Sequence, residues 1–184
     1  MIEIKAEGIE YAEKQLSAYP ERIRRAAYNA VDRTLTHLKK TISASVRKEY
    51  NAYDEEIKKT LVIQRVSKNV LSGSVRSSGR ALSFNAFKIK KPKKGKGPLK
   101  VKIRKRNGAK TMRGAFIGVS KKGYTGVMQR KGKKPYPLRV LYALSVPQMV
   151  GNTEVTTDIE KEAEEYLNKR FLHEVDYQLG KAGK

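Results

Sequence analysis

The chain has 184 residues, of which 39% are apolar, and its formal net charge is +23. This length suits one domain with one modest core, and a chain this basic needs a polyanionic partner or an acidic protein surface to offset its own repulsion. The absence of Cys excludes disulfides, thiol catalysis and cysteine-based zinc sites. The first residues are too polar for a signal peptide and no apolar run is long enough to span a membrane. We therefore expect no membrane partner, and a location in the cytoplasm or in an assembly built there.

The charge excess lies in the middle of the chain. Residues 57–153 hold 26 basic residues and no acid, whereas residues 1–56 are balanced and residues 154–184 hold eight acids and five bases. A disordered basic tail would place the excess at one end. We therefore expect the excess to belong to a folded part of the chain.

Residues 1–56 are predicted to be helical. After a short amphipathic stretch through Ile9, Ala12 and Leu16, a long helix is expected to begin at Pro20, because proline is tolerated in the first helical turn. Asn51 is expected to end it, and Asp54 to cap a short following helix. Apolar residues recur along the long helix at spacings of three to five, as an amphipathic helix requires. They are Ile23, Ala27, Ala30, Leu35, Leu38, Ile42 and Val46.

Residues 57–135 are predicted to form a basic antiparallel sheet. Strand candidates lie at 61–66, 70–77 and 81–84. In the following basic stretch, two runs alternate apolar and basic residues on either side of a lysine-rich loop, 92–98, that contains glycine and proline. Alternation around a turn predicts a β-hairpin whose apolar residues face a core. These inward residues are Phe87, Ile89, Leu99, Val101 and Ile103. A turn at Asn107-Gly108 and a second hairpin, 115–119 with 124–129, are expected next.

Residues 136–152 are predicted to be a connecting arm with a short helical turn, because Pro137 and Pro147 interrupt its apolar sequence. An exposed apolar arm suits contacts between subunits. The candidate contact residues are Tyr136, Leu138, Leu141, Tyr142, Val146 and Met149.

The last helix is expected over 153–180, with Thr153 or Thr157 as its cap. Its apolar line is predicted to be Ile159, Ala163, Tyr166, Leu167, Phe171, Val175 and Leu179. Together the elements predict a single α+β domain, 1–184, in which the long N-terminal helix and the C-terminal helix pack on an antiparallel sheet built from hairpins.

Enzyme chemistry finds little support in the sequence. His37 and His173 are the only histidines, and neither lies near a second ligand type at metal spacing. His37 is expected to be a surface or interface residue. The acid-free middle removes the carboxylates that a two-metal nuclease needs, and the acids at 54–56 suit the start of a helix. We predict no catalytic residue, no cofactor and no metal.

The basic hairpin is the main functional candidate. Its outer face and loop would attract phosphates or acidic side chains, and lysine suits charge attraction more than base recognition. A face that is only solvated is the alternative. The candidate contacts are Lys88, Lys90, Lys93, Lys94, Lys96, Lys100, Lys102 and Arg104.

Five segments in a fixed order carry a family resemblance. They are 22–26, 46–50, 79–83 with Phe87, 114–117 followed by 126–127 and 130–134, and 145–149. With these segments the chain resembles the phage minor tail protein Z family, also known as tail completion proteins. The resemblance implies a non-enzymatic virion protein of the tail or neck that finishes the head-proximal tail end and joins it to the head.

The resemblance further implies a homo-oligomeric ring of six copies. Its expected partners are the tail tube or tail terminator, the head-completion or connector proteins, and genomic DNA in the channel. A free-standing basic nucleic-acid-binding protein is the alternative. That alternative predicts strongly salt-dependent binding to free DNA or RNA as a monomer.

Overall fold

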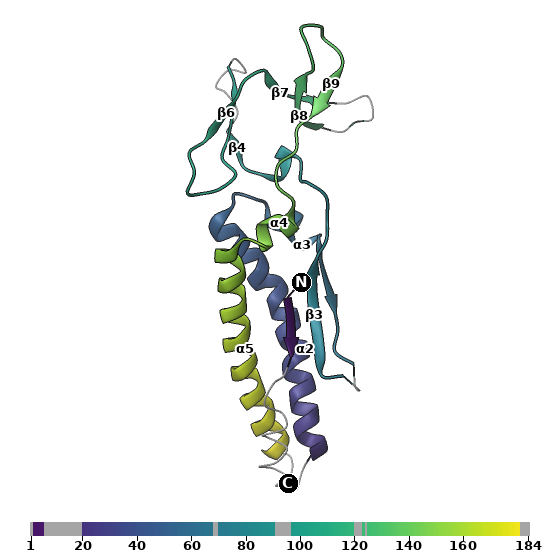
Figure 1. Cartoon of the computed structure of the whole chain (residues 1–184). Helices are drawn as coiled ribbons and strands as arrows, with labels where there is room; N and C mark the ends of the chain where they lie inside the picture. The colour runs from purple at the N-terminus through teal and green to yellow at the C-terminus, as the bar shows by residue number, and fades with distance from the viewer. Residues whose placement is uncertain are drawn as a thin grey trace. The chain divides into compact units, whose positions relative to one another are not determined.

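The computed structural model describes residues 2–5, 20–67, 70–90, 97–119, 123 and 125–180. It confirms the α+β class: Figure 1 shows a long N-terminal helix, a C-terminal helix and three small antiparallel sheets. The chain divides into two compact units. Unit 1 comprises Met1–Ile42, Leu61–Ser77 and Thr153–Lys184, and unit 2 comprises Ser43–Thr60 and Ser78–Asn152. The expectation of a single domain over 1–184 stays a prediction.

The long helix α2, Pro20–Glu49, confirms the amphipathic pattern. All seven apolar residues predicted to line it are at most 1% exposed. Thr34 is also buried, and its hydroxyl donates to the carbonyl oxygen of Ala30 at 2.7 Å, which satisfies a polar group inside the core. Residues 20–42 of α2 belong to unit 1, and residues 43–49 belong to unit 2.

The sheet of unit 1 has the order β1-β3-β2, with antiparallel pairing throughout. Its strands are β1 (Ile2–Lys5), β2 (Leu61–Gln64) and β3 (Ser72–Ser77). The predicted strands 61–66 and 70–77 are thereby confirmed. The prediction that residues 1–56 are helical is wrong for Ile2–Lys5, whose four residues alternate apolar and polar, the period of a strand. The helical stretch expected around Ile9 lies outside the described residues.

Helix α5, Thr153–Gly180, begins where the C-terminal helix was predicted. Val155, Ile159 and Ala163 are buried, as its apolar spacing requires. Further along, the buried positions are polar: Glu174 is 2% exposed and Gln178 is 8% exposed, whereas predicted apolar residues there are half-buried.

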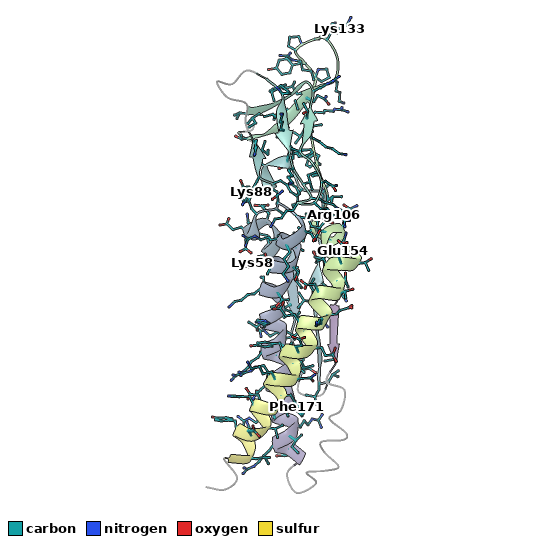
Figure 2. All side chains as sticks on the ribbon, turned by 90° about the vertical axis from the view of Figure 1, so that its left-hand side faces the viewer. Lys58, Lys88, Arg106, Lys133, Glu154 and Phe171 are labelled. Atoms are coloured by element: carbon teal, nitrogen blue, oxygen red, sulfur yellow. The ribbon has the colours of Figure 1, made fainter. Side chains whose placement is uncertain are left out.

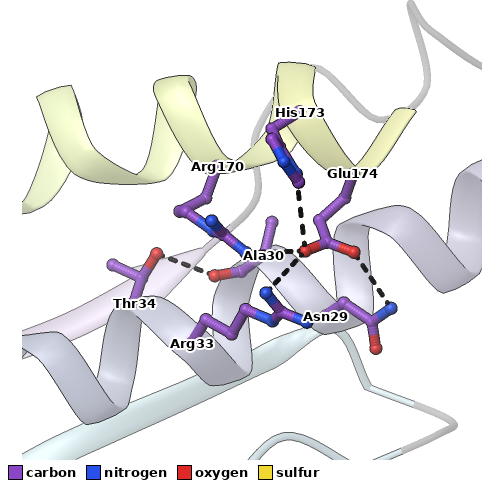
Figure 3. A network of polar contacts seen from close by, with 7 residues as sticks. All are labelled: Asn29, Ala30, Arg33, Thr34, Arg170, His173 and Glu174. Atoms are coloured by element: carbon purple, nitrogen blue, oxygen red, sulfur yellow. Dashed lines mark hydrogen bonds and ion pairs between the residues drawn. The ribbon is translucent and has the colours of Figure 1, made fainter. Parts of the chain in front are cut away.

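A network of charged groups surrounds Glu174, as Figure 3 shows. Its carboxylate lies 3.2 Å from Nη1 of Arg33 on α2 and 2.9 Å from Nη2 of Arg170 one turn back on α5. The side-chain amide of Asn29 donates to the other carboxylate oxygen at 3.3 Å, and Nδ1 of His173 lies 4.0 Å away. A buried carboxylate is tolerated only with such partners, so this network joins the two helices of unit 1 at a specific register.

Unit 2 contains two three-stranded antiparallel sheets, β4-β5-β6 and β7-β8-β9. The first consists of β4 (Ile89–Lys90), β5 (Leu99–Val101) and β6 (Lys110–Met112). The second consists of β7 (Ala115–Val119), β8 (Thr125–Arg130) and β9 (Leu138–Val140). Both predicted hairpins are confirmed, with Ile89 opposite Val101 and Ile117 opposite Val127. Phe84, Leu99, Val101, Ala115 and Val127 form the core of these sheets.

Two predictions within unit 2 are wrong. Residues 81–84 do not form a strand, because only Ser83 makes a bridge, to Tyr142, and a 3-10 turn follows at Phe84–Ala86. The connecting arm is not without strands, because Leu138–Val140 pairs with β8. Pro137 stands immediately before this strand, where proline costs no ladder hydrogen bond.

The two short helices of unit 2 have different caps, and that of α3 differs from the prediction. Tyr53, and not Asp54, is the N-cap of α3 (Asp54–Lys58), and its side chain makes no capping hydrogen bond. The three acids of α3 still lie in its first turn, where their negative charge interacts favourably with the positive end of the helix dipole. Helix α4, Val146–Val150, begins with a capping box in which Ser145 and Gln148 bond each other's backbone amides.

Candidate interaction surface

The predicted basic hairpin presents four lysines on one face. Lys90 lies directly opposite Lys100 in the β4–β5 pair, and Lys88 and Lys102 lie two residues further along the same face. All four are exposed, whereas Ile89 is half-buried and Val101 is buried on the opposite face. We refer to Lys88, Lys90, Lys100 and Lys102 as the lysine face.

The segment that carries the lysine face has no acid of its own, although Lys88 lines a cleft with Asp54, Glu55 and Glu56. Residues 78–152 contain no Asp and no Glu. None of the four lysines forms an ion pair within the part of the chain that the structure describes. Like charges directly opposite each other destabilise a strand pair, so this arrangement costs unit 2 stability until a negative group approaches.

Arg104 differs from the other residues of the predicted contact set. Its guanidinium carbon lies 5.4 Å from the ring centroid of Tyr50, which is 1% exposed, and the two residues form a backbone bridge. Arg104 therefore also holds the end of α2 against the hairpin by a cation–π contact. Lys93, Lys94 and Lys96 lie outside the described residues, and their contact role stays a prediction.

A second basic surface, which was not predicted as a site, lies between β8 and β9. Residues 131–137, the β8–β9 loop, are all exposed and include Lys131, Lys133 and Lys134. Figure 2 labels Lys133 within this loop. Tyr136 is 71% exposed, and the backbone amide of Lys131 donates to Pro137 at 3.0 Å, which closes the loop. In the sequence, the signal for this surface was the run of basic residues 130–134, which Tyr136 follows closely.

The predicted subunit contacts separate into exposed and buried residues. Tyr136 and Tyr142 are 71% and 59% exposed, and Leu138 and Leu141 are half-buried. Val146 and Met149, on the capped helix α4, are both 0% exposed. The subunit contact stays a prediction, and Tyr136 and Tyr142 are its most accessible members.

Two of the four carboxylates of unit 2, those of Asp54 and Glu56, form local contacts. Asp54 accepts a hydrogen bond from Ser43 at 2.5 Å and lies 2.6 Å from Nζ of Lys58. The hydrogen bond with Lys58, followed by that with Ser43, lowers the pKa of Asp54 below its ordinary value. These contacts hold α3 against the end of α2 and give Asp54 a structural role.

His37 lies on α2 beside α5, within unit 1. Its Nε2 is 3.5 Å from the carboxylate of Glu162, and its ring stacks on Tyr166 with a centroid distance of 3.9 Å. Among the described residues there is no group of three or more His, Asp or Glu side chains placed to hold a metal ion.

The exposed cations of the lysine face and of the β8–β9 loop form the candidate interaction surface of the described residues. A family model for prophage minor tail protein Z (GPZ) matches residues 6–182, and the chain belongs to this family. Membership indicates a structural protein of a phage tail and hence a virion component. No curated protein and no solved structure matches the chain. None of the helices in the described residues is long and apolar enough to cross a membrane.

Proposed function

We propose that the protein completes the head-proximal end of the phage tail and joins it to the head, as a non-enzymatic subunit of a ring. The observation that carries this proposal is the lysine face of an acid-free segment, in a member of a minor tail protein family. A protein that meets DNA or acidic neighbours at the tail end would use such a surface. The ring and its location are what family resemblance leads us to expect.

The chemistry of the lysine face favours contact with DNA phosphates over recognition of bases. Lysine ammonium groups act as point charges, whereas base recognition relies on planar, bidentate side chains such as arginine. The apolar rings beside the hairpin, Phe84 and Phe87, are buried at 8% and 1% exposure, so they supply no platform for stacked bases. Contact without sequence preference suits a protein past which the whole genome must move.

The energetic cost of the opposed lysines supports the same proposal. Lys90 and Lys100 repel each other across the strand pair, and a phosphate chain would convert this repulsion into attraction with release of counterions. A solvated face with no ligand would gain nothing from this arrangement. We therefore assign the lysine face to DNA and expect binding to weaken steeply with salt.

A phage lacking the gene tests the proposal. Lysates are examined by electron microscopy for free heads and free tails, and purified protein is then added back. We expect filled heads and tails that do not join, and joining on addition of the protein. Normal particles from the deletion phage would refute the proposal.

The same purified protein tests the alternative of a free-standing nucleic-acid-binding protein. That alternative predicts tight, salt-dependent DNA binding by a monomer and no restoration of joining. The lysine face and the β8–β9 loop are the observations that favour it.

A further inference from the structure

A groove in unit 2 combines an apolar floor with a basic rim. Its volume is about 520 Å³, and Phe84, Val101, Met112 and Leu141 are among the residues that line its floor. This volume lies in the range of sites that enclose a few side chains. The groove uses the side of β5 opposite Lys100, so it is a different surface from the lysine face.

The rim of the groove contains cations and no acid. They are Arg104, Lys110, Arg113 and Arg139. Lys110 and Arg113 are exposed and form no ion pair within the described part of the chain. An occupant of this groove must therefore bring apolar surface for the floor and negative charge for the rim.

Hydrogen bonds hold part of the rim in place. Nε of Arg139 donates to the side-chain oxygen of Gln129 at 3.1 Å, and the amide nitrogen of Gln129 donates to the carbonyl oxygen of Arg113 at 3.0 Å. Arg104 is fixed over the ring of Tyr50. A rim that is already ordered loses less entropy when it binds a partner.

Helix α5 of unit 1 carries the complementary arrangement. Leu172 is 65% exposed, although it is a large apolar residue in the middle of a long helix. Glu165 lies seven residues before it and Asp176 four residues after it, and these spacings place all three on one side of the helix, which also carries the exposed Lys169. Neither acid has an ion-pair partner in the described residues. We refer to Glu165, Leu172 and Asp176 as the acidic face of α5.

We propose that the groove of unit 2 binds the acidic face of α5 from a second copy of this chain. Leu172 of one copy enters the apolar floor, and Glu165 and Asp176 meet the cations of the rim. The two surfaces are different, so the contact is heterologous and leaves each copy with one free groove and one free face. Such a contact repeats from copy to copy and closes into a ring when the rotation permits. This inference deepens the proposed ring and rests on it for its biological setting.

A charge exchange between variants tests the contact in the full-length protein. The rim variant carries Lys110→Glu and Arg113→Glu, and the α5 variant carries Glu165→Lys and Asp176→Lys. Analytical ultracentrifugation at low salt should show association of the wild type and monomers of each variant alone. Mixing the two variants should restore association, because every groove then finds a face of opposite charge.

A matched control separates the groove from net charge. Arg25→Glu with Lys40→Glu makes the same change of charge at exposed positions of α2 and should leave association close to that of the wild type. A wild type that stays monomeric at its highest soluble concentration would overturn the inference. Association of both variants like the wild type, or no restoration when two folded variants are mixed, would also overturn it.

The apolar half of the contact has its own test. Leu172→Ala keeps a strong helix former at the position, so the fold is preserved, and it should weaken association about tenfold or more. Val62→Ala alters another exposed apolar residue of unit 1, 59% exposed, and should have no effect on association. Equal effects of the two substitutions would contradict the docking of Leu172.

DNA provides the competing outcome for the rim. If the rim variant loses affinity for a short duplex but keeps self-association, the groove serves DNA and the inference is wrong. These measurements contain no heads or tails, so their failure is distinct from failure to restore joining in the deletion phage.

Discussion

The two units of this protein differ in the balance between their basic and acidic residues. Unit 1 holds 16 basic and 14 acidic residues, whereas unit 2 holds 25 basic and 4 acidic residues. In unit 1, charged side chains form contacts such as Arg33 with Glu174 and Arg65 with Asp32. In unit 2, all four acids lie within residues 43–60, and the segment 78–152 has none. The charges of unit 1 are nearly balanced, whereas unit 2 carries a large excess of positive charge.

The difference indicates where substitutions should affect stability and where they should affect function. Removing a charge from the network of unit 1 leaves a buried group without a partner, which costs folding free energy. Removing a charge from the lysine face relieves repulsion and costs binding instead. The predictions below test this division, beginning with the largest expected effect.

Glu174→Ala should lower the free energy of unfolding of unit 1 by about 3–5 kcal/mol, because it leaves Arg170 partly buried without its carboxylate. Urea denaturation followed by helical circular dichroism measures the loss. The control Asp32→Ala removes an exposed pair with Arg65 and should cost at most about 1 kcal/mol. Similar small losses for both variants would show that the buried network is not a stabilising element.

Gly73→Ala should destabilise unit 1 by about 1–3 kcal/mol, because the core there has no space for an added methyl group. The new Cβ would overlap Leu35 and lie 2.9 Å from the carbonyl oxygen of Gln64. Gly108→Ala, where nothing lies within 4 Å of the added atom, should stay within about 0.5 kcal/mol of the wild type. The same urea titration compares them, and equal midpoints would refute the close packing of β3 on α2.

Lys100→Glu should change stability and binding in opposite directions. It places an acid opposite Lys90 and should raise the free energy of unfolding of unit 2 by about 0.2–1 kcal/mol. Affinity for duplex DNA should fall. The slope of log affinity against log salt concentration should become shallower by about one. Lys169→Glu makes the same change on an exposed position of unit 1 and should leave the slope unchanged. A lower stability together with unchanged DNA affinity would contradict the proposed use of the lysine face.

Asp54→Asn should have the smallest effect, limited to acid pH. The folded pKa of Asp54 lies below its ordinary value of 3.8, so its stabilisation is fully present above that value and disappears as pH falls through the folded pKa. Its side chain is 35% exposed, so solvent screening keeps the contribution below about 1 kcal/mol. Thermal unfolding between neutral and acid pH should show a shallower acid decline for this variant than for Glu55→Gln. Identical declines would refute the assignment.

The periodic parts of the fold could be predicted from the sequence. Helix α2 repeats its apolar positions over many turns, and both hairpins alternate around recognisable turns, so local patterns sufficed. The strand Ile2–Lys5 is too short for its alternation to outweigh the neighbouring helical pattern, and it depends on pairing with β3. The prolines near β9 likewise led to the prediction of a loop in place of this strand.

Only part of the candidate site could be predicted from sequence patterns. Alternation identified the lysine face, because inward and outward residues follow from a period of two. The burial of Glu174 could not be predicted, since its partners Asn29 and Arg33 lie more than a hundred residues away in the chain. Burial of Val146 and Met149 depends on the capped turn of α4, and the groove arises from two sheets whose packing no local pattern describes.

The most direct test of the division between the units neutralises equal charge in each. One phage carries Lys88, Lys90, Lys100 and Lys102 changed to Gln, and a matched phage carries Arg25, Lys40, Arg76 and Lys169 changed to Gln, all exposed positions. Electron microscopy of lysates measures the fraction of tails joined to heads. We predict that joining collapses in the first phage and stays near wild type in the second. Normal joining in the first phage, or equal loss in both, would contradict the account.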